Sequence, residues 1–391
     1  MNVRRERLRK RMDLCEKKDC TGCFACKSVC PKGAISTGQD ELHKTIPVID
    51  TEKCIECGLC RKVCPALNQS EYREPLHCYA SWTKNSADQI DCASGGIATT
   101  LSRSFMRNGG KVYGTAYEKN LDLKIKMAAS EEDLEVFKSS KYVQSDTADS
   151  YISVKEQLQQ GKEVLYIGTP CQINGLLHFL QKPYENLYTV DLICHGVPPI
   201  EYLKEYINNI ISKKKIDKVD FRGKYDYYFT AYSGKDIVYQ KRNYEDLYYD
   251  AFSKGVIFRD NCYSCAYARK ERVSDITIGD FWGIDKKSLK NRCDARVSLV
   301  FTNTLKGEKL LAQTDNLYIE ERTMEDALKC NEQLKSPSKP HSDRRIFIEN
   351  ISKGSYQALQ KTEIGRNIRR NKNRNCILIR CMRKVKRLLI K

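Results

Sequence analysis

Runs of apolar residues alternate with amphipathic stretches over most of the chain beyond residue 77. Short apolar runs bounded by glycine, proline or polar residues predict buried strands, and apolar positions at helical spacing predict helices packed on them. The predicted strands are Lys111–Tyr117, Glu163–Ile167, Leu187–Ile193, Asp275–Ile278 and Val297–Thr302, and the predicted helices are Gln172–Gln181 and Pro199–Ile211. This alternation predicts an α/β domain.

Two other stretches show a different pattern. The Tyr-rich segment 221–240 predicts two or three strands in a meander, and Ala34–Ser36 and Ile46–Ile49 predict two short strands around a polar turn. A polar linker follows at 66–76. We therefore expect a mixed α/β or α+β protein, with a small N-terminal module ahead of a larger α/β domain. The pattern does not predict the order of the strands.

An internal repeat occupies residues 15–65. Four cysteines and a proline recur 34 positions later: Cys20, Cys23, Cys26, Cys30 and Pro31 as Cys54, Cys57, Cys60, Cys64 and Pro65. Three closely spaced cysteines followed by a fourth and a proline are typical of bacterial-ferredoxin-type 4Fe-4S ligation. The alternative is two zinc sites with four cysteines each, which normally show two separated C-x2-C pairs. The repeat predicts two 4Fe-4S clusters.

In this duplicated arrangement the fourth ligand of each cluster comes from the other repeat. One cluster is therefore assigned to Cys20, Cys23, Cys26 and Cys64, and the other to Cys54, Cys57, Cys60 and Cys30. Cys15 is left over and is interpreted as an incidental thiol.

Charge is concentrated at the two ends of the chain. The formal net charge of the 391 residues is +18, but residues 1–11 and 364–391 carry nearly all of it. A nearly neutral centre argues against a nucleic-acid-binding protein that uses structural clusters and basic ends. No apolar stretch follows the basic N-terminus or is long enough to span a membrane, so we expect a reducing, cytoplasmic location.

The basic C-terminal segment has a predicted role of its own. Leu378, Met382, Val385 and Leu389 recur at helical spacing among basic residues, which predicts an amphipathic helix that contacts the inner face of a membrane peripherally. The alternative is a solvated tail. The predicted division is a basic arm (1–14), the ferredoxin-type module (15–66), the larger domain (77–345) and a basic helical tail (346–391).

Several glycine and cysteine motifs punctuate the larger domain. They are Ser94-Gly95-Gly96, Gly168-Thr169-Pro170-Cys171-Gln172, Cys194-His195-Gly196, the pair Cys262 and Cys265, and the segment from Asp275 to Gly283. In this order, after a two-cluster module, they resemble the beta-subunit family of coenzyme F420 hydrogenases and dehydrogenases over about residues 15–300. The resemblance implies an FAD-binding domain that exchanges electron pairs between flavin and a partner through iron–sulfur clusters.

Candidate FAD-binding residues combine this resemblance with local chemistry. Ser94, Gly95 and Gly96 precede a predicted helix, Ile97–Phe105, whose N-terminal amides suit a pyrophosphate; the alternative is an ordinary capping turn. Thr99, Thr169, Pro170, Gly279 and Asp280 complete the candidate set, and the resemblance places Trp282 with Asp280 at the cofactor site.

Four further thiols predict a third metal site. Cys171 follows Thr169 and Pro170 at a predicted helix N-terminus, where the helix dipole is expected to lower the pKa of its thiol. Cys194 ends the next strand, and Cys262 and Cys265 complete a set of four, enough for a third cluster or a zinc ion. The alternative is buried small apolar residues plus an incidental pair. His195 is a candidate proton donor to substrate or flavin, although a lone histidine at a strand end is more often structural.

Together these features predict an iron–sulfur flavoprotein oxidoreductase. It would take single electrons from a ferredoxin-like carrier or redox partner subunit, pass them through two 4Fe-4S clusters to FAD, and reduce a two-electron substrate. The alternative is a non-catalytic electron-transfer subunit that feeds a partner enzyme. Use of coenzyme F420 itself, the substrate and the oligomeric state are left open.

Overall fold

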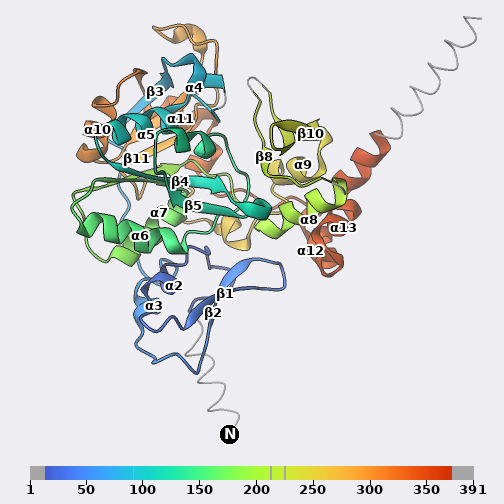
Figure 1. Ribbon diagram of the computed structural model, residues 1–391. Coiled ribbons are helices and arrows are strands. Elements are labelled where there is room, and N and C mark those ends of the chain that lie inside the picture. The colour runs from blue at the N-terminus through green and yellow to red at the C-terminus, as the bar shows by residue number, and fades with distance from the viewer. Residues whose placement is uncertain (1–13, 91, 212–213, 224–225, 372–391) are drawn as a thin grey trace, which may run out of the picture.

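The structure is a computed structural model that describes residues 14–371 except 91, 212–213 and 224–225. A large central sheet with helices on both faces forms the body of the molecule (Figure 1). The N-terminal module lies below this body in the view, and a second lobe lies beside it. The mixed α/β architecture predicted from the sequence is confirmed.

The N-terminal module is small and packs against the body through a helix. Its elements are α2 (Ala25–Val29), β1 (Ile35–Gln39), β2 (Thr45–Ile49) and α3 (Leu59–Lys62). β1 and β2 pair antiparallel, with Ile35 opposite Ile49, as the two predicted strands around a turn require. The short helix α2 contacts α6 (Ala148–Gln159) and α7 (Pro170–Leu180) of the body. The first cysteine repeat is therefore held against the larger domain.

Eight strands form the central sheet in the order β13-β3-β12-β11-β7-β6-β4-β5. Their bounds are β3 (His77–Thr83), β4 (Lys111–Tyr117), β5 (Leu123–Met127), β6 (Val164–Gly168), β7 (Leu187–Leu192), β11 (Ile276–Asp280), β12 (Ser298–Thr302) and β13 (Leu317–Arg322). The central strands β11, β7, β6 and β4 are parallel, and antiparallel strands flank them on both sides. Ligands of parallel α/β sheets bind at the carboxyl ends of such strands.

Each face of the sheet is covered by helices because successive strand residues point to opposite sides. Tyr166 packs with α6 and α7, whereas its neighbour Leu165 packs with α5 (Ile97–Arg107) and α10 (Leu305–Ala312). The first of these cores also contains Cys23 and Val63 of the N-terminal module. The module therefore shares a hydrophobic core with the sheet.

The second lobe contains a three-stranded antiparallel sheet, which confirms the predicted meander. Its elements are β8 (Lys218–Asp220), β9 (Tyr228–Ser233), β10 (Asp236–Arg242), α8 (Ile200–Ile210), α9 (Leu247–Ser253), α12 (Asp343–Asn350) and α13 (Ser355–Lys361). Phe347 and Leu359 are buried in the core of this lobe. The predicted start of a separate tail at residue 346 thus falls inside α12, and the division into domains stays a prediction.

Several further helices are short connections. They are α4 (Ser86–Ile90), α11 (Met324–Cys330) and the 3-10 helices Lys119–Leu121, Glu132–Phe137, Asn243–Glu245, Asp260–Ser264, Lys286–Ser288, Glu332–Leu334 and Ile351–Lys353. Within the described part of the chain, no helix combines the length and apolar character needed to cross a bilayer. The predicted amphipathic helix from Leu378 and the basic arm up to residue 13 lie outside the described residues.

Candidate functional site

The first cysteine group lies where the N-terminal module meets the body. Cys23 and Cys26 are buried, and Cys20 and Cys64 are half-buried. Burial raises the pKa of Cys26, and the facing thiols of Cys23, Cys20 and Cys64 raise it further. The structure therefore brings together the four thiols that the sequence assigned to one cluster, including Cys64 from the second repeat.

Cys15 lies beside this group, although no motif in the sequence includes it. Hydrogen bonds with Cys20 and then Cys64 raise the pKa of the Cys15 thiol. The same contact with Cys15 is the main reason that the pKa of Cys20 falls to about 6. Cys15 is not part of the repeat, so only the folded structure places it at the site.

The second cysteine group lies closer to solvent. Burial raises the pKa of Cys60, and the neighbouring thiols of Cys54 and Cys57 contribute. Cys57 is exposed, whereas Cys30 and Cys60 pack beside Cys26 of the first group. The two groups are thus adjacent, with the second facing solvent and the first facing the body.

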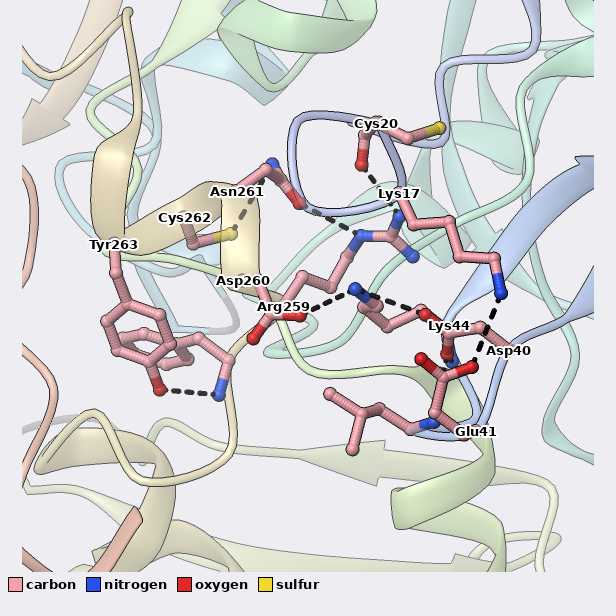
Figure 2. A network of polar contacts seen from close by, with 12 residues as sticks. Lys17, Cys20, Asp40, Glu41, Lys44, Arg259, Asp260, Asn261, Cys262 and Tyr263 are labelled. Atoms are coloured by element: carbon pink, nitrogen blue, oxygen red, sulfur yellow. Dashed lines mark hydrogen bonds and ion pairs between the residues drawn. The ribbon is translucent and has the colours of Figure 1, made fainter. Parts of the chain in front are cut away.

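Three side chains of the body hold the loop of the first group by its backbone. Thr147 Oγ1 donates to Cys23 O at 2.7 Å, and Gln144 Nε2 donates to Thr21 O at 3.1 Å. Arg259 Nη2 donates to Cys20 O at 3.0 Å, as Figure 2 shows. None of these residues belongs to a motif recognisable in the sequence, and all three come from segments more than 120 positions away.

Glycines allow the close approach of this loop. Gly22 has φ +66°, and a Cβ there would lie 2.4 Å from Gln144 Nε2. On the body side, a Cβ at Gly175 of α7 would lie 2.7 Å from Cys23 Cβ and 2.9 Å from its Sγ. Both positions therefore need glycine for the module to dock.

The structure also brings together the four thiols of the predicted third site. Burial raises the pKa of Cys194 well above its usual range, and the thiols of Cys262, Cys171 and Cys265 add to the shift. Cys171 follows the Thr169 N-cap and Pro170 at the start of α7, and Thr169 and Gln172 form the expected capping box. Cys262 lies in the 3-10 helix Asp260–Ser264.

The predicted thiolate character of Cys171 is wrong for the protein without a bound metal. Burial raises the pKa of this thiol to about 11, and the neighbouring Cys265 contributes in the same direction. Desolvation of a buried charge outweighs the helix N-terminus here.

The described residues contain no group of three or more His, Cys, Asp or Glu side chains arranged around a single metal ion. In a four-iron cluster each thiolate binds a different iron, so its ligands are spread more widely than those of one ion.

A cavity of about 520 Å³ opens at the carboxyl ends of the parallel strands. It brings together most of the predicted FAD-binding and catalytic residues: Ser94, Gly96, Thr99, Thr169, His195, Gly279, Asp280 and Trp282. Gly95 and Pro170 are not among its lining residues. A Cβ at Gly95 would lie 2.6 Å from Ser81 O, so this glycine serves the packing of the loop on the sheet. Cys194 also lines the cavity, which therefore adjoins the third thiol group.

The amino end of α5 faces this cavity. Gly96 is its N-cap with φ +84°, and among the described residues no side chain caps the amides of the first turn. Lys141, which the sequence analysis missed, also lines the cavity and donates from Nζ to the carbonyls of Val136, Phe137 and Lys138 at 3.1, 3.0 and 2.7 Å. Burial lowers the pKa of Lys141 to about 7. The free amides of α5 and the positive charge of Lys141 suit an anionic group.

Both ring nitrogens of His195 contact protein groups. The nitrogen Nε2 lies 3.2 Å from Ser253 O and so carries the proton, and Gln333 Nε2 donates to Nδ1 at 2.9 Å. Burial lowers the pKa of His195, which keeps the ring neutral. This arrangement favours the structural interpretation, and the catalytic role stays a prediction.

Asp280 forms a half-buried ion pair that bridges the body and the second lobe. Arg222 Nη2 lies 2.7 Å from Asp280 Oδ2, and Arg222 Nη1 also donates to Ala93 O at 2.8 Å. Tyr227 stacks with Trp282 beside this pair, with ring centroids 6.2 Å apart. Asp280 therefore positions the second lobe over the cavity.

Comparisons with known proteins give two domain matches. Residues 19–68 match a 4Fe-4S dicluster domain, and residues 161–327 match the family described as the C terminus of the coenzyme F420 hydrogenase/dehydrogenase beta subunit. A solved structure of the xenon-derivatised F420-reducing NiFe hydrogenase complex from Methanosarcina barkeri matches with a TM-score of 0.45 and 17% identity, over 74% of this chain and 91% of that chain. No curated protein sequence matches. The two domain matches confirm the resemblance seen in the sequence: residues 161–327 of this iron–sulfur protein match the C-terminal domain of the coenzyme F420 hydrogenase/dehydrogenase beta-subunit family.

Proposed function

We propose that this chain is an iron–sulfur flavoprotein oxidoreductase, which takes single electrons from a ferredoxin-like carrier or partner subunit and reduces a substrate by two electrons at FAD. The observation that carries the proposal is a continuous series of thiol groups from the surface to the cavity. The exposed Cys57 begins it, and Cys194 at the cavity ends it. FAD, when bound, supplies the conversion between one-electron and two-electron transfer.

The ligand assignment follows the three thiol groups. Cys20, Cys23, Cys26 and Cys64 would hold one 4Fe-4S cluster, Cys54, Cys57, Cys60 and Cys30 the second, and Cys171, Cys194, Cys262 and Cys265 a third. Each group supplies four thiols, the number that a cubane cluster requires. In the first and third groups the thiols face one another in sites where a free thiolate would be costly.

Helix α7 connects the first and third groups. Cys171 lies in its first turn, and Gly175 lies one turn later against Cys23. One helical turn advances about 5.4 Å, so the two groups are neighbours across this turn. Burial raises the pKa of Tyr267, and both Cys171 and Cys23 contribute to the shift, so this ring lies near thiols of both groups. The arrangement supports electron transfer from the module to the cavity.

The cavity fits the anionic part of FAD. Its volume of about 520 Å³ is typical of cofactor and ligand sites. The amides at the start of α5, together with Ser94, Gly96 and Thr99, would hold the pyrophosphate, and Lys141 would supply a positive charge. Thr169, Gly279 and Asp280 line the same cavity beside Cys194.

Anaerobic purification with iron, sulfide and flavin measured per chain tests the proposal. We expect about twelve irons and one FAD, since three cubane clusters hold about four irons each. About eight irons with bound FAD would refute the third cluster and leave the rest of the proposal intact. Clusters without flavin and without turnover would support the alternative, a relay subunit that feeds a partner enzyme. Cys194→Ser should lose about four irons, whereas the exposed Cys330→Ser should lose none.

The affinity for FAD is expected to depend on pH through Lys141. Because burial lowers its pKa to about 7, the free protein loses the Lys141 proton as the pH rises through neutrality, and binding of an anionic phosphate should weaken. Titration of the flavin-free protein between pH 6 and 9 measures this. Lys141→Gln should bind FAD roughly tenfold more weakly at pH 6, because a positive charge near the phosphate is lost, and its affinity should not fall further as the pH rises.

Lys138→Gln is the matched control. Lys138 also lines the cavity, but its ammonium is paired with Asp88 at 3.0 Å and Glu135 at 2.8 Å. The pH dependence should therefore persist in Lys138→Gln. Equal pH profiles of the wild type and Lys141→Gln would show that Lys141 does not contact the cofactor.

A further inference from the structure

Arg259 is a buried cation located between the first and third thiol groups. The residue is fully buried and directly precedes the 3-10 helix that carries Cys262. Its side chain extends toward the N-terminal module, where Nη2 donates to Cys20 O at 3.0 Å and Nη1 to Thr45 O at 3.2 Å. Figure 2 shows the guanidinium joined to Cys20 and to Asn261, the residue next to Cys262. One side chain thus contacts the loops of both sites.

The partners of Arg259 are neutral. Besides the two carbonyls, Nη1 donates to Gln144 Oε1 at 2.6 Å and Nε to Asn261 Oδ1 at 3.3 Å. Among the described ion pairs none involves Arg259, although a buried charge without a counter-charge is costly. The neighbouring Lys44, by contrast, pairs with Asp40 at 3.1 Å and Asp260 at 2.6 Å (Figure 2). The missing counter-charge must come from elsewhere.

Iron–sulfur clusters with four thiolate ligands are anionic and would supply that charge. The guanidinium of Arg259 acts electrostatically on thiols of both sites, namely Cys20 of the first and Cys171 and Cys262 of the third. A nearby positive charge stabilises the reduced, more negative cluster, because net charge and hydrogen bonds set cluster potentials.

We propose that Arg259 is the shared counter-charge of the first and third sites and raises the reduction potential of the cluster held by Cys20, Cys23, Cys26 and Cys64. The inference rests on the proposed ligand assignment. A higher potential at this inner cluster would favour electron transfer to it from the outer cluster held by Cys54, Cys57, Cys60 and Cys30. Arg259 acts through the clusters and is a positioning residue.

Redox titration with dithionite, followed by electron paramagnetic resonance of the full anaerobic chain, tests this. The signal lost in Cys23→Ser identifies the first cluster. Arg259→Met should shift electron occupancy from the first cluster to the second by about tenfold, which is about 59 mV for one electron, at unchanged iron content. Arg259→Lys, which keeps the charge, should retain most of the wild-type potential.

A second pair of variants separates the effect of the Arg259 charge from that of local packing. This pair also tests the inference if Arg259→Met does not fold. Gln144→Glu and Gln144→Met lose the same hydrogen bonds to Thr21 O and Gly22 O, but only the glutamate neutralises Arg259. Gln144→Glu should lower the first-cluster potential, and Gln144→Met should not. Equal potentials in both variants would overturn the inference.

The outcomes also distinguish this inference from the proposed function. Absence of the Cys23-dependent signal in the wild type would overturn the ligand assignment and the inference together. If both cluster signals are present but neither Arg259→Met nor Gln144→Glu changes the first-cluster potential, the inference alone is overturned. A shifted potential in a chain that binds no flavin would support the inference and refute the oxidoreductase.

Discussion

Replacing Cys64 by serine is expected to remove the cluster of the first cysteine repeat and to leave that of the second repeat in place. The reason is that Cys64 faces Cys20, Cys23 and Cys26 in the folded chain, although it belongs to the second repeat in the sequence. A cubane cluster without its fourth thiolate is not retained stably, so the iron content should fall by about four per chain. Electron transfer from a one-electron donor to the cavity should fall to background, since the first site is the step between surface and α7.

Iron analysis and electron paramagnetic resonance of the anaerobic protein measure this effect. Cys30→Ser should remove the signal of the second cluster, which Cys57→Ser should also remove. Cys330→Ser is the control, because Cys330 is exposed and belongs to none of the three thiol groups. If Cys64→Ser and Cys57→Ser lost the same signal, the exchange of fourth ligands between the repeats would be refuted.

Replacing Arg272 by methionine is expected to produce the largest loss of folding stability. Arg272 and Asp191 are buried, with Arg272 Nη2 lying 3.0 Å from Asp191 Oδ1. Arg272 also donates to the carbonyls of Tyr267 and Leu192 at 3.0 and 3.2 Å. It thereby ties the end of β7, next to Cys194, to the segment that follows Cys265. Removing it leaves the Asp191 carboxylate buried without its cation, which costs about 3–5 kcal/mol.

Urea unfolding of the anaerobic protein measures the change in free energy of unfolding. The double variant Arg272→Met with Asp191→Leu should recover most of the loss, because an apolar pair of similar volume replaces a buried ion pair at little cost. Arg269→Met is the matched control: this arginine is exposed and pairs with Glu271 at 2.8 Å, so we expect a loss of less than about 1 kcal/mol. A loss in Arg272→Met as small as that of Arg269→Met would contradict the assigned role of the ion pair.

The elements of the fold were largely predictable from local patterns. The predicted strand Lys111–Tyr117 coincides with β4, and the cap formed by Thr169 and Pro170 starts α7 as expected. Such features depend on residues within one turn or one strand, where periodicity and capping act. The strand order, by contrast, places β3 between β12 and β13, and no local pattern contains this information.

The candidate site likewise combines features set by local sequence patterns with features set by contacts between distant segments. The repeat spacing alone predicted the eight ferredoxin-type cysteines, because C-x2-C-x2-C spacing places three ligands of one cluster on a single short loop. The positions of the other site residues depended on contacts between distant segments. Gly95 packs on β3 away from the cavity lining, and the ring nitrogens of His195 are taken up by Ser253 and Gln333.

The amino-acid sequence by itself determined that this chain holds a duplicated cysteine module followed by an α/β domain of a recognisable family. Only the tertiary structure decided that the first cysteine group faces inward, that Cys171 and Cys194 meet Cys262 and Cys265, and that Arg259 lies between these sites. The physical reason is the distance along the sequence over which each interaction acts. Capping, turns and repeat spacing act over a few residues, whereas burial and the surroundings of a charge depend on which distant segments pack together.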